Sequence, residues 1–268
     1  MTHFGLPAPP VWRAALIAVA IIALNGASTA AAARPLSEIM ADGALRVGLT
    51  GDYAPFSLRG ANGAIEGADV DMARSLARAL NVTLVLVPTS WKTLAADLAA
   101  DRFDVAMGGV SVTPDRAALG DFSHPVLSDG KRPIVRCADR DRLTSVAAID
   151  RPDVRVVVNP GGTNERFARA NLKGASVAVH AENRTIFEEI ADGRADVMVT
   201  DGAEVDYQAR RHPGVLCAAA VAQPFDRSEK AYWMTRDPNL KAAVDRWLDA
   251  SLAAGDYDRA LAVAATAR

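Results

Sequence analysis

The sequence predicts an α/β protein of two lobes, each a mainly parallel sheet flanked by helices, with a ligand cleft between the lobes. The order strand, helix, strand, helix, strand occurs twice, once before residue 111 and once over 154–200. This order is typical of a parallel sheet covered by helices. No low-complexity linker separates the halves, and a cleft between two lobes is a common place for a ligand.

The first set of elements begins with LRVGLT (45–50), whose alternation of side chains predicts a half-buried strand. VDMARSLARALN (70–81) carries apolar residues at helical spacing, and VTLVLVP (82–88) predicts a buried strand. We expect a helix within 91–102 and a strand over FDVAMGGV (103–110).

The second set repeats this order. VRVVVN (154–159) predicts a strand, followed by a helix that ends near Leu172. ASVAVH (175–180) is the next expected strand, TIFEEIADG (185–193) the next helix and ADVMVT (195–200) the last strand.

The remaining segment returns to the first lobe in this interpretation. PFDRSEKAYWMTR (224–236) has strand character, and an amphipathic helix is expected over 238–253. The predicted division is therefore 34–133 for the first part of lobe 1, 134–222 for lobe 2 and 223–268 for the return to lobe 1.

The first 33 residues predict an export signal. Arg13 is followed by the apolar run AALIAVAIIAL and then by the small residues NGASTAAAA, which is the pattern of a cleaved signal peptide. The apolar run is shorter than the roughly 20 residues that cross a bilayer. We expect residues 1–33 to be removed by cleavage near Ala33, and a retained membrane anchor is the alternative.

Composition excludes several classes of partner. The net charge is −2, and loss of Arg13 with the signal makes it −2 − 1 = −3, which argues against nucleic acid. No second apolar run has membrane length, so we expect no membrane contact after signal removal.

Cys137 and Cys217 form an even pair, which in an oxidising compartment favours a disulfide. The histidines lack metal-ligand spacing, and we expect no metal.

SVTPDR (111–116) predicts the start of a helix. Thr113 is a good N-cap and Pro114 suits the first helical position, which puts Arg116 one turn in. One interpretation is a capped helix with a surface arginine. The other is a carboxylate held in a bidentate fork by Arg116, with help from main-chain N–H groups.

VNPGGTNERFARANL (158–172) predicts a second helix start. Gly161 and Gly162 allow a backbone nest for an anion, and Thr163 or Asn164 is expected to cap the helix. No G-K-[ST] or G-x-G-x-x-G motif is present, so a carboxylate or inorganic anion fits better than a nucleotide phosphate. Asn159 would project into the same cleft. The alternative is a capped turn without a ligand.

TDGAE (200–204) is the third helix start. Asp201 and Glu204 have the spacing of a capping box, in which both side chains satisfy free N–H groups. Alternatively, Glu204 lies in the cleft, where desolvation raises its pKa and lets it donate a proton. The sequence alone leaves both interpretations open.

Aromatic residues and a lysine complete the candidate site. Asp52 and Tyr53 in GDYAPFS, together with Trp91, could line a pocket for a ring, although the aromatic residues fit a core equally well. Lys131 in SDGKRPI precedes the expected crossing strand. It either reaches the cleft or is an ordinary solvated lysine.

The segments GDYAPFS, DRFDVAMGG, SVTPDR and NPGGTNE resemble periplasmic amino-acid-binding proteins over nearly the whole mature chain. TGDYAPFS, VPTSW, DGKRPI, VNPGGTNERFARANLK, TDGAE and EKAY are similar, more specifically, to the cyclohexadienyl dehydratases, an enzyme family on the same fold. The resemblance implies a type II periplasmic-binding-protein-like fold and a periplasmic location.

The resemblance also implies an activity and roles. These enzymes remove water and CO2 from prephenate to give phenylpyruvate, and from arogenate to give phenylalanine. Glu204 matches the general acid, and Lys131 and Asn159 match residues that assist binding and position that acid. Aromatisation drives the reaction, so no cofactor is implied. Arg116 and Thr163 match the positions that hold carboxylates, and Asp201 matches an acid that faces the ammonium group in amino-acid binders. Together with the residues of the helix starts and the aromatic segments, the expected substrate-binding set is Arg116, Thr113, Thr163, Gly162, Asp201, Asp52, Tyr53 and Trp91.

The chain departs from the family pattern in three places. His124 stands where an apolar residue is expected, Gly108 makes its turn less polar, and the tail after Tyr257 is short and alanine-rich.

The alternative function is that of a receptor that delivers an amino acid to an ABC importer. Such a receptor needs Arg116 and Asp201, the latter to face the ammonium group, but has no need of an acid at Glu204 or a cation at Lys131. The sequence leaves open the preference between prephenate and arogenate, and whether the chain forms a homo-oligomer.

Overall fold

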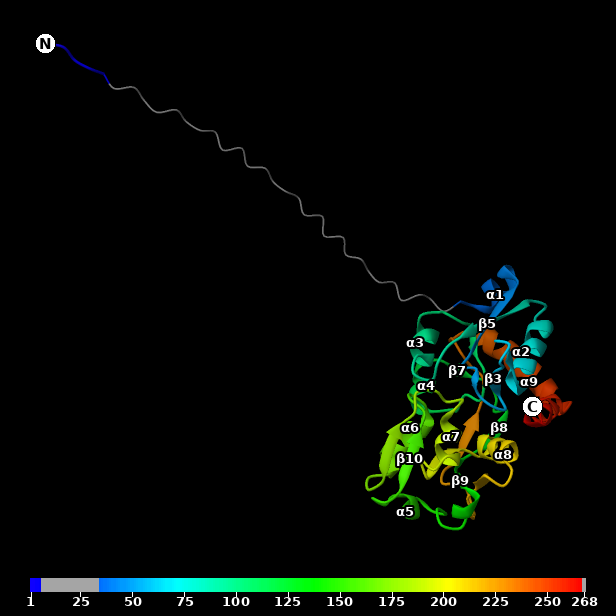
Figure 1. Ribbon diagram of the computed structural model, residues 1–268. Helices are drawn as coiled ribbons and strands as arrows, with labels where there is room; N and C mark the ends of the chain where they lie inside the picture. The colour runs from blue at the N-terminus through cyan, green and yellow to red at the C-terminus, as the bar shows by residue number, and fades with distance from the viewer. Residues whose placement is uncertain (6–33, 267–268) are drawn as a thin grey trace. The chain divides into compact units, whose positions relative to one another are not determined.

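The structure is a computed structural model that describes residues 1–5 and 34–266 (Figure 1). The predicted signal peptide, residues 1–33, lies outside the described residues apart from its first five, and it stays a prediction. Within the described ranges, no helix has the length and apolar character needed to cross a membrane.

The first sheet has the strand order β5-β1-β6-β15-β7. β5, β1 and β6 are parallel, and only β15 runs against its neighbours, so the sheet is mainly parallel as predicted. Its strands are β1 (Ala44–Leu49), β5 (Thr83–Pro88), β6 (Val105–Ala106), β7 (Asp121–Phe122) and β15 (Trp233–Met234).

The strand predicted over 82–88 exists, but the prediction that it is buried was wrong. β5 lies at the edge of the sheet, and its residues alternate between exposed and half-buried. An edge strand has a neighbour on one side only, so its apolar run is covered only in part.

The second sheet repeats the plan with the order β11-β10-β12-β9-β13. β11, β10 and β12 are parallel, and β9 runs against both of its neighbours. Its strands are β9 (Lys131–Arg136), β10 (Arg155–Val158), β11 (Ser176–Val179), β12 (Val197–Asp201) and β13 (Leu216–Ala218).

The chain passes between the sheets twice, through the paired strands β8 (Leu127–Asp129) and β14 (Ser228–Lys230). β8 leads into β9 of the second sheet, and β14 leads back into β15 of the first. The lobe boundaries expected after residues 133 and 222 stay predictions, and the second sheet already begins at Lys131. A small sheet of β2 (Asp52–Tyr53), β3 (Ser57–Arg59) and β4 (Ile65–Glu66) follows β1.

The predicted helices are present, with α9 matching the expected range 238–253, and the structure adds α1, η1, α5 and α10, which were not predicted. The helices beside the first sheet are α1 (Leu36–Asp42), α2 (Ala68–Ala79), α3 (Leu94–Ala99), α4 (Pro114–Leu119), α9 (Pro238–Ala253) and α10 (Asp256–Thr266). Those of the second part are the short 3-10 helix η1 (Cys137–Asp139), α5 (Val146–Ile149), α6 (Thr163–Asn171), α7 (Ile186–Ala191) and α8 (Gly202–Arg211).

Each sheet has a separate apolar core. Val47, Leu76 and Val244 belong to a core between the first sheet and its helices. Val156 and Val197 belong to a core on the second sheet. This arrangement leaves the carboxyl ends of the parallel strands free to carry polar residues.

A disulfide joins Cys137 in η1 to Cys217 in β13, with the two sulfur atoms 2.07 Å apart. It links the start and the end of the second part of the chain, 80 residues apart in sequence.

The three departures from the family pattern have structural roles. Exposed His124 joins α9 through Asp249 (Nδ1 to Oδ1, 2.8 Å). Gly108 has a φ of 99° and donates its N–H to Asp69 (2.9 Å), in a turn that tolerates few side chains. The tail forms α10, with Tyr257 buried in the core.

Candidate functional site

The predicted residues of the two halves meet around one small cavity of about 10 Å³, which has room for at most about one water molecule. The first part of the chain lines it with Tyr53, Trp91, Gly109 and Ser111. The second part lines it with Asn159, Gly162, Thr163, Asn164 and Asp201. The three helix starts of the sequence therefore converge, but in this closed arrangement they leave no room for a ring.

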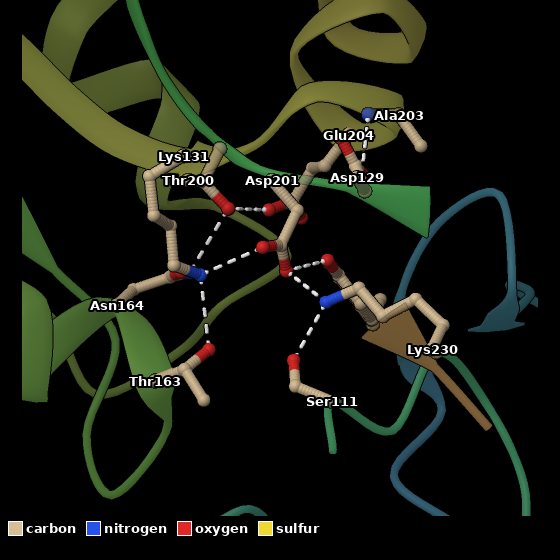
Figure 2. A network of polar contacts seen from close by, with 12 residues as sticks. Ser111, Asp129, Lys131, Thr163, Asn164, Thr200, Asp201, Ala203, Glu204 and Lys230 are labelled. Atoms are coloured by element: carbon tan, nitrogen blue, oxygen red, sulfur yellow. Dashed lines mark hydrogen bonds and ion pairs between the residues drawn. The ribbon is translucent and has the colours of Figure 1, made fainter. Parts of the chain in front are cut away.

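Asp201 is the centre of the site, at the end of β12 and only 2 % exposed. Its Oδ1 accepts from the Lys131 Nζ at 2.8 Å and its Oδ2 from the Lys230 Nζ at 2.5 Å (Figure 2). The Tyr53 hydroxyl also donates to Oδ2. Burial would raise the pKa of Asp201, but the two ammonium groups outweigh burial and hold that pKa far below its usual value.

Lys131 is buried and not solvated, which decides between the two interpretations of that residue. Besides Asp201, its Nζ donates to Thr163 Oγ1 (2.9 Å) and to Asn164 Oδ1 (2.5 Å). A lysine ammonium has three N–H donors, so all three are used. Lys131 thus fixes the start of α6 against the end of β12.

Glu204 is 1 % exposed and accepts a hydrogen bond from Thr200 Oγ1 at 2.5 Å (Figure 2). Thr200 accepts in turn from Asn164 Nδ2 (2.9 Å), which also donates to Asn159 Oδ1 (3.0 Å). Burial raises the pKa of Glu204 to about 8, and the charge of Asp201 acts in the same direction. At neutral pH the carboxyl is therefore mostly protonated, although it does not itself line the cavity.

The capping-box interpretation of Asp201 and Glu204 is wrong, because a distant residue caps α8 in their place. Asp129, at the end of β8, accepts from the N–H groups of Gly202 (3.0 Å) and Ala203 (3.1 Å). Asp201 is the N-cap by position, but its side chain makes no capping hydrogen bond. Both acids are thereby free to take part in the polar network.

The cap predicted for the helix after the glycine pair is also wrong. α6 begins at Thr163, and its N-cap is Gly162, which has no side chain to make a capping bond. The Thr163 and Asn164 side chains accept from Lys131 instead. The Gly161 N–H meets an anion from the same chain, the carboxylate of Glu165, at 2.7 Å. This part of the expected nest is therefore occupied by the protein itself.

Gly161 also allows a close approach between the two parts of the chain. Its φ is 78°, and a Cβ built on it would lie 2.7 Å from the Cα of Lys92. Only glycine fits there.

The aromatic residues form one wall. The rings of Tyr53 and Trp91 meet edge to face with centroids 5.4 Å apart. Asp52 accepts from Trp91 Nε1 (3.1 Å), and Asn183 of the second part donates to the Asp52 carbonyl (2.9 Å). Asp52 thus lies beside the cavity, holding the tryptophan in place.

Arg116 and Thr113 do not line the cavity in this arrangement. Thr113 caps α4 as predicted, accepting from the Arg116 N–H at 3.4 Å. The buried guanidinium of Arg116 donates to the Ser111 carbonyl (2.8 Å) and lies 5.9 Å from the Trp91 ring centroid. Burial, with the nearby charge of Arg166, lowers the pKa of Arg116 to about 10, so it remains a cation at neutral pH.

Lys230, Ser111, Asn164 and Thr200 belong to the site, although the sequence patterns did not indicate them as site residues. Lys230 is 0 % exposed and lies at the end of β14. The one available signal was the matched segment EKAY, to which no role was given. Ser111 and Thr200 each adjoin a predicted helix start, and Asn164 was expected only to cap one.

A larger cavity of about 590 Å³ lies elsewhere, between β8, α8 and α10, and none of the predicted site residues lines it. The polar cluster, in contrast, combines two lysines, an arginine and a mostly protonated carboxyl. Such a combination can bind a small organic anion and give it a proton.

Comparison with known proteins agrees with this chemistry. Residues 45–262 match the bacterial extracellular solute-binding proteins, family 3. The chain is 50 % identical over 241 residues to the cyclohexadienyl dehydratase of Pseudomonas aeruginosa, covering 90 % of each chain.

Two solved structures are similar as well. An ancestral cyclohexadienyl dehydratase is 50 % identical, with a TM-score of 0.54 and coverage of 88 % of this chain and 98 % of that one. An ancestral amino acid-binding protein, described as a precursor of cyclohexadienyl dehydratase, is 35 % identical, with a TM-score of 0.76 and coverage of 84 % and 96 %.

Proposed function

The chain belongs to the family 3 bacterial extracellular solute-binding proteins, and from that premise we propose that it is an enzyme on this fold, a cyclohexadienyl dehydratase. It converts prephenate to phenylpyruvate and arogenate to phenylalanine, a step toward an aromatic amino acid. Both reactions release water and CO2, and both leave an aromatic ring.

The observation that carries the proposal is the fully buried Glu204. Its pKa of about 8 keeps a proton on the carboxyl at neutral pH, and Thr200 fixes its orientation. A receptor that only binds an amino acid gains nothing from a buried proton donor, whereas an elimination with a poor leaving group needs one.

In the proposed reaction, Glu204 protonates the ring hydroxyl while the C–O bond breaks and water leaves. The bond between the ring and its carboxylate breaks at the same time, CO2 leaves, and the released electron pair completes the aromatic ring. Glu204 is left as a carboxylate and regains its proton from solvent. A positioned acid contributes about 10²–10⁴-fold to such a step.

The other residues hold the substrate. Arg116 and the start of α6 at Gly162 and Thr163 take carboxylates, with Thr113 holding the helix that carries Arg116. Lys131 and Asn159 position the network around Glu204. Tyr53 and Trp91 cover the ring, Asp52 anchors Trp91, and Asp201 orients Lys131.

Substrate entry requires the lobes to separate, because a cavity of about 10 Å³ is far smaller than a ring with two carboxylates. Closure then excludes water and keeps Glu204 protonated next to the substrate. Opening also exposes Glu204, which in the closed arrangement reaches the cavity only through Thr200 and Asn164.

We also propose export to the periplasm through cleavage of the signal peptide at residues 1–33. The family is extracellular, which supports this location. Mass spectrometry of the mature protein from a periplasmic extract tests it, with an N-terminus near Arg34 as the expected result.

The deciding experiment is a spectrophotometric assay of phenylpyruvate after the purified mature protein is mixed with prephenate. We expect turnover without an added cofactor. Calorimetric titration with the common amino acids is the parallel arm. Absence of turnover together with tight binding of one amino acid would establish the receptor function instead.

A further inference from the structure

Lys230 is a buried cation to which the proposed reaction gives no role. It is 0 % exposed, and its Nζ contacts Asp201 Oδ2 at 2.5 Å and Ser111 Oγ at 2.7 Å. The Nζ also lies 5.7 Å from the centroid of the Tyr53 ring. All three of these neighbours line the small cavity.

Complete burial of a lysine is uncommon and costly unless a partner compensates the charge. Here burial lowers the pKa of Lys230, and the Asp201 carboxylate opposes that effect. The partner is not exclusive, however, because Lys131 occupies the other oxygen of the same carboxylate. Two ammonium groups thus share one carboxylate, and the cluster carries a local charge of 2 − 1 = +1.

The two lysines of the cluster also differ in how many of their N–H groups form hydrogen bonds. Lys131 uses its three N–H groups on Thr163, Asn164 and Asp201, whereas Lys230 uses two, on Asp201 and Ser111. One N–H of Lys230 therefore has no acceptor among the described residues. Asp201, the acid nearest the cavity, already accepts from two lysines and from Tyr53.

We propose that Lys230 is a specificity-determining residue, which makes this pocket select a 2-oxo acid dianion over the corresponding amino acid. This inference rests on the proposed function, in which the two candidates are prephenate and arogenate. They differ where one has a keto oxygen and the other an ammonium group. A keto oxygen accepts the unused N–H, whereas an ammonium group meets a cluster of like charge whose carboxylate is already bound.

The size of the effect follows from the distances. A like charge placed about 4 Å from the Lys230 ammonium weakens binding by more than about tenfold at an intermediate dielectric constant. Removing the Lys230 charge takes the local total to 1 − 1 = 0. The penalty on the ammonium then disappears, together with the attraction for the dianion.

The test compares kcat/KM for prephenate and for arogenate in the native protein and in Lys230→Met. Methionine keeps the unbranched chain and removes the charge. We expect the prephenate-to-arogenate ratio to fall by at least about tenfold, mainly through a higher KM for prephenate. Lys173→Met makes the same change at an exposed lysine two residues beyond the end of α6 and should leave the ratio unchanged.

A purely structural role for Lys230 predicts a different result, since loss of packing lowers both values of kcat/KM by the same factor. An unchanged ratio in folded Lys230→Met would therefore overturn the inference and leave the proposed function intact. Failure of the native protein to turn over either substrate would instead overturn the proposed function, and the inference with it.

Asp201→Asn keeps the test decisive where Lys230→Met does not fold. It removes the negative charge and takes the local total to +2, so the ratio should move in the opposite direction, rising by at least about tenfold. An unchanged or lower ratio in that variant would also overturn the inference.

Discussion

The two lobes have the same arrangement of strands and helices. They differ in which side chains at their helix starts remain available to the site. In the first lobe, α4 is capped by its own Thr113, so the helix start supplies one cation, Arg116, beside the Trp91 ring. In the second lobe, α8 takes its cap from Asp129 on the strand that links the sheets. Its own acids, Asp201 and Glu204, are released for the polar network.

This difference shows how a binding fold gains chemistry without a change of topology. A helix that caps itself uses its first polar residue for stability. A helix capped from a distance keeps that residue available, at the cost of depending on another element. In the proposed function the second lobe therefore supplies the acid and the carboxylate site at the start of α6, and the first lobe supplies Arg116 and the aromatic residues that cover the ring.

The strongest test of the comparison is Glu204→Gln. Removal of the proton donor should lower kcat by about 10²–10⁴-fold, while folding and the binding of a substrate analogue stay close to native. Glu188→Gln, at an exposed position of α7, is the matched control and should retain activity. Full activity in Glu204→Gln would reject its role as the acid.

The pH profile tests the same carboxyl without mutation. Because Glu204 must be protonated and its pKa is about 8, kcat should be level below pH 8 and fall about tenfold per unit above it. The folded-state pKa exceeds the ordinary 4.5, so the unfolding free energy should also fall as pH rises from 4.5 to 8. A rate that rises from pH 7 to 9 would contradict this assignment.

The disulfide lies in the second lobe, and its removal tests how much it stabilises the protein. Replacing Cys137 and Cys217 by alanine should lower the free energy of unfolding by about 2–4 kcal/mol, because the unfolded chain gains freedom over 80 residues. Denaturant titration with and without a reductant measures it. Two free thiols in the unreduced, denatured protein would contradict the pairing.

The smallest expected effect comes from comparing two helix caps. The distant residue Asp129 caps α8, whereas α5 is capped by the adjacent Ser145. Asp129→Ala and Ser145→Ala each remove the cap of one helix and should each lower stability by about 1 kcal/mol. Only Asp129→Ala should also lower kcat/KM, because the free N–H groups of α8 draw Asp201 out of its lysine pairs. Equal activity in the two variants would show that the capping of α8 by Asp129 does not affect the site.

Prediction from the sequence succeeded where the signal is local. The apolar periodicity of 238–253 predicts α9, and the T-P pair predicts the start of α4 with Thr113 as its cap. These features depend on neighbouring residues, which the sequence displays directly.

Prediction from the sequence failed where a residue distant in the chain determines the local structure. The cap of α8 lies 73 residues away, at Asp129, so the capping-box spacing of TDGAE was misleading. Lys230 can be buried because Asp201 and Ser111 accept hydrogen bonds from its ammonium group. Ser111 is 119 residues away in sequence. Neither distance is visible in a local pattern.

The lysine pairs of Asp201 also affect how tightly any substrate is held. The closed cleft already satisfies its central charges with its own side chains, so the protein acts as an intramolecular competitor of its substrate. Binding must disrupt or rearrange contacts that exist before the substrate arrives. The apparent dissociation constant is the intrinsic one divided by the fraction of molecules that can accept substrate, so it rises as this self-satisfied form becomes more populated. A modest affinity also speeds release, because an aromatic product that cannot replace those contacts is expelled as they re-form.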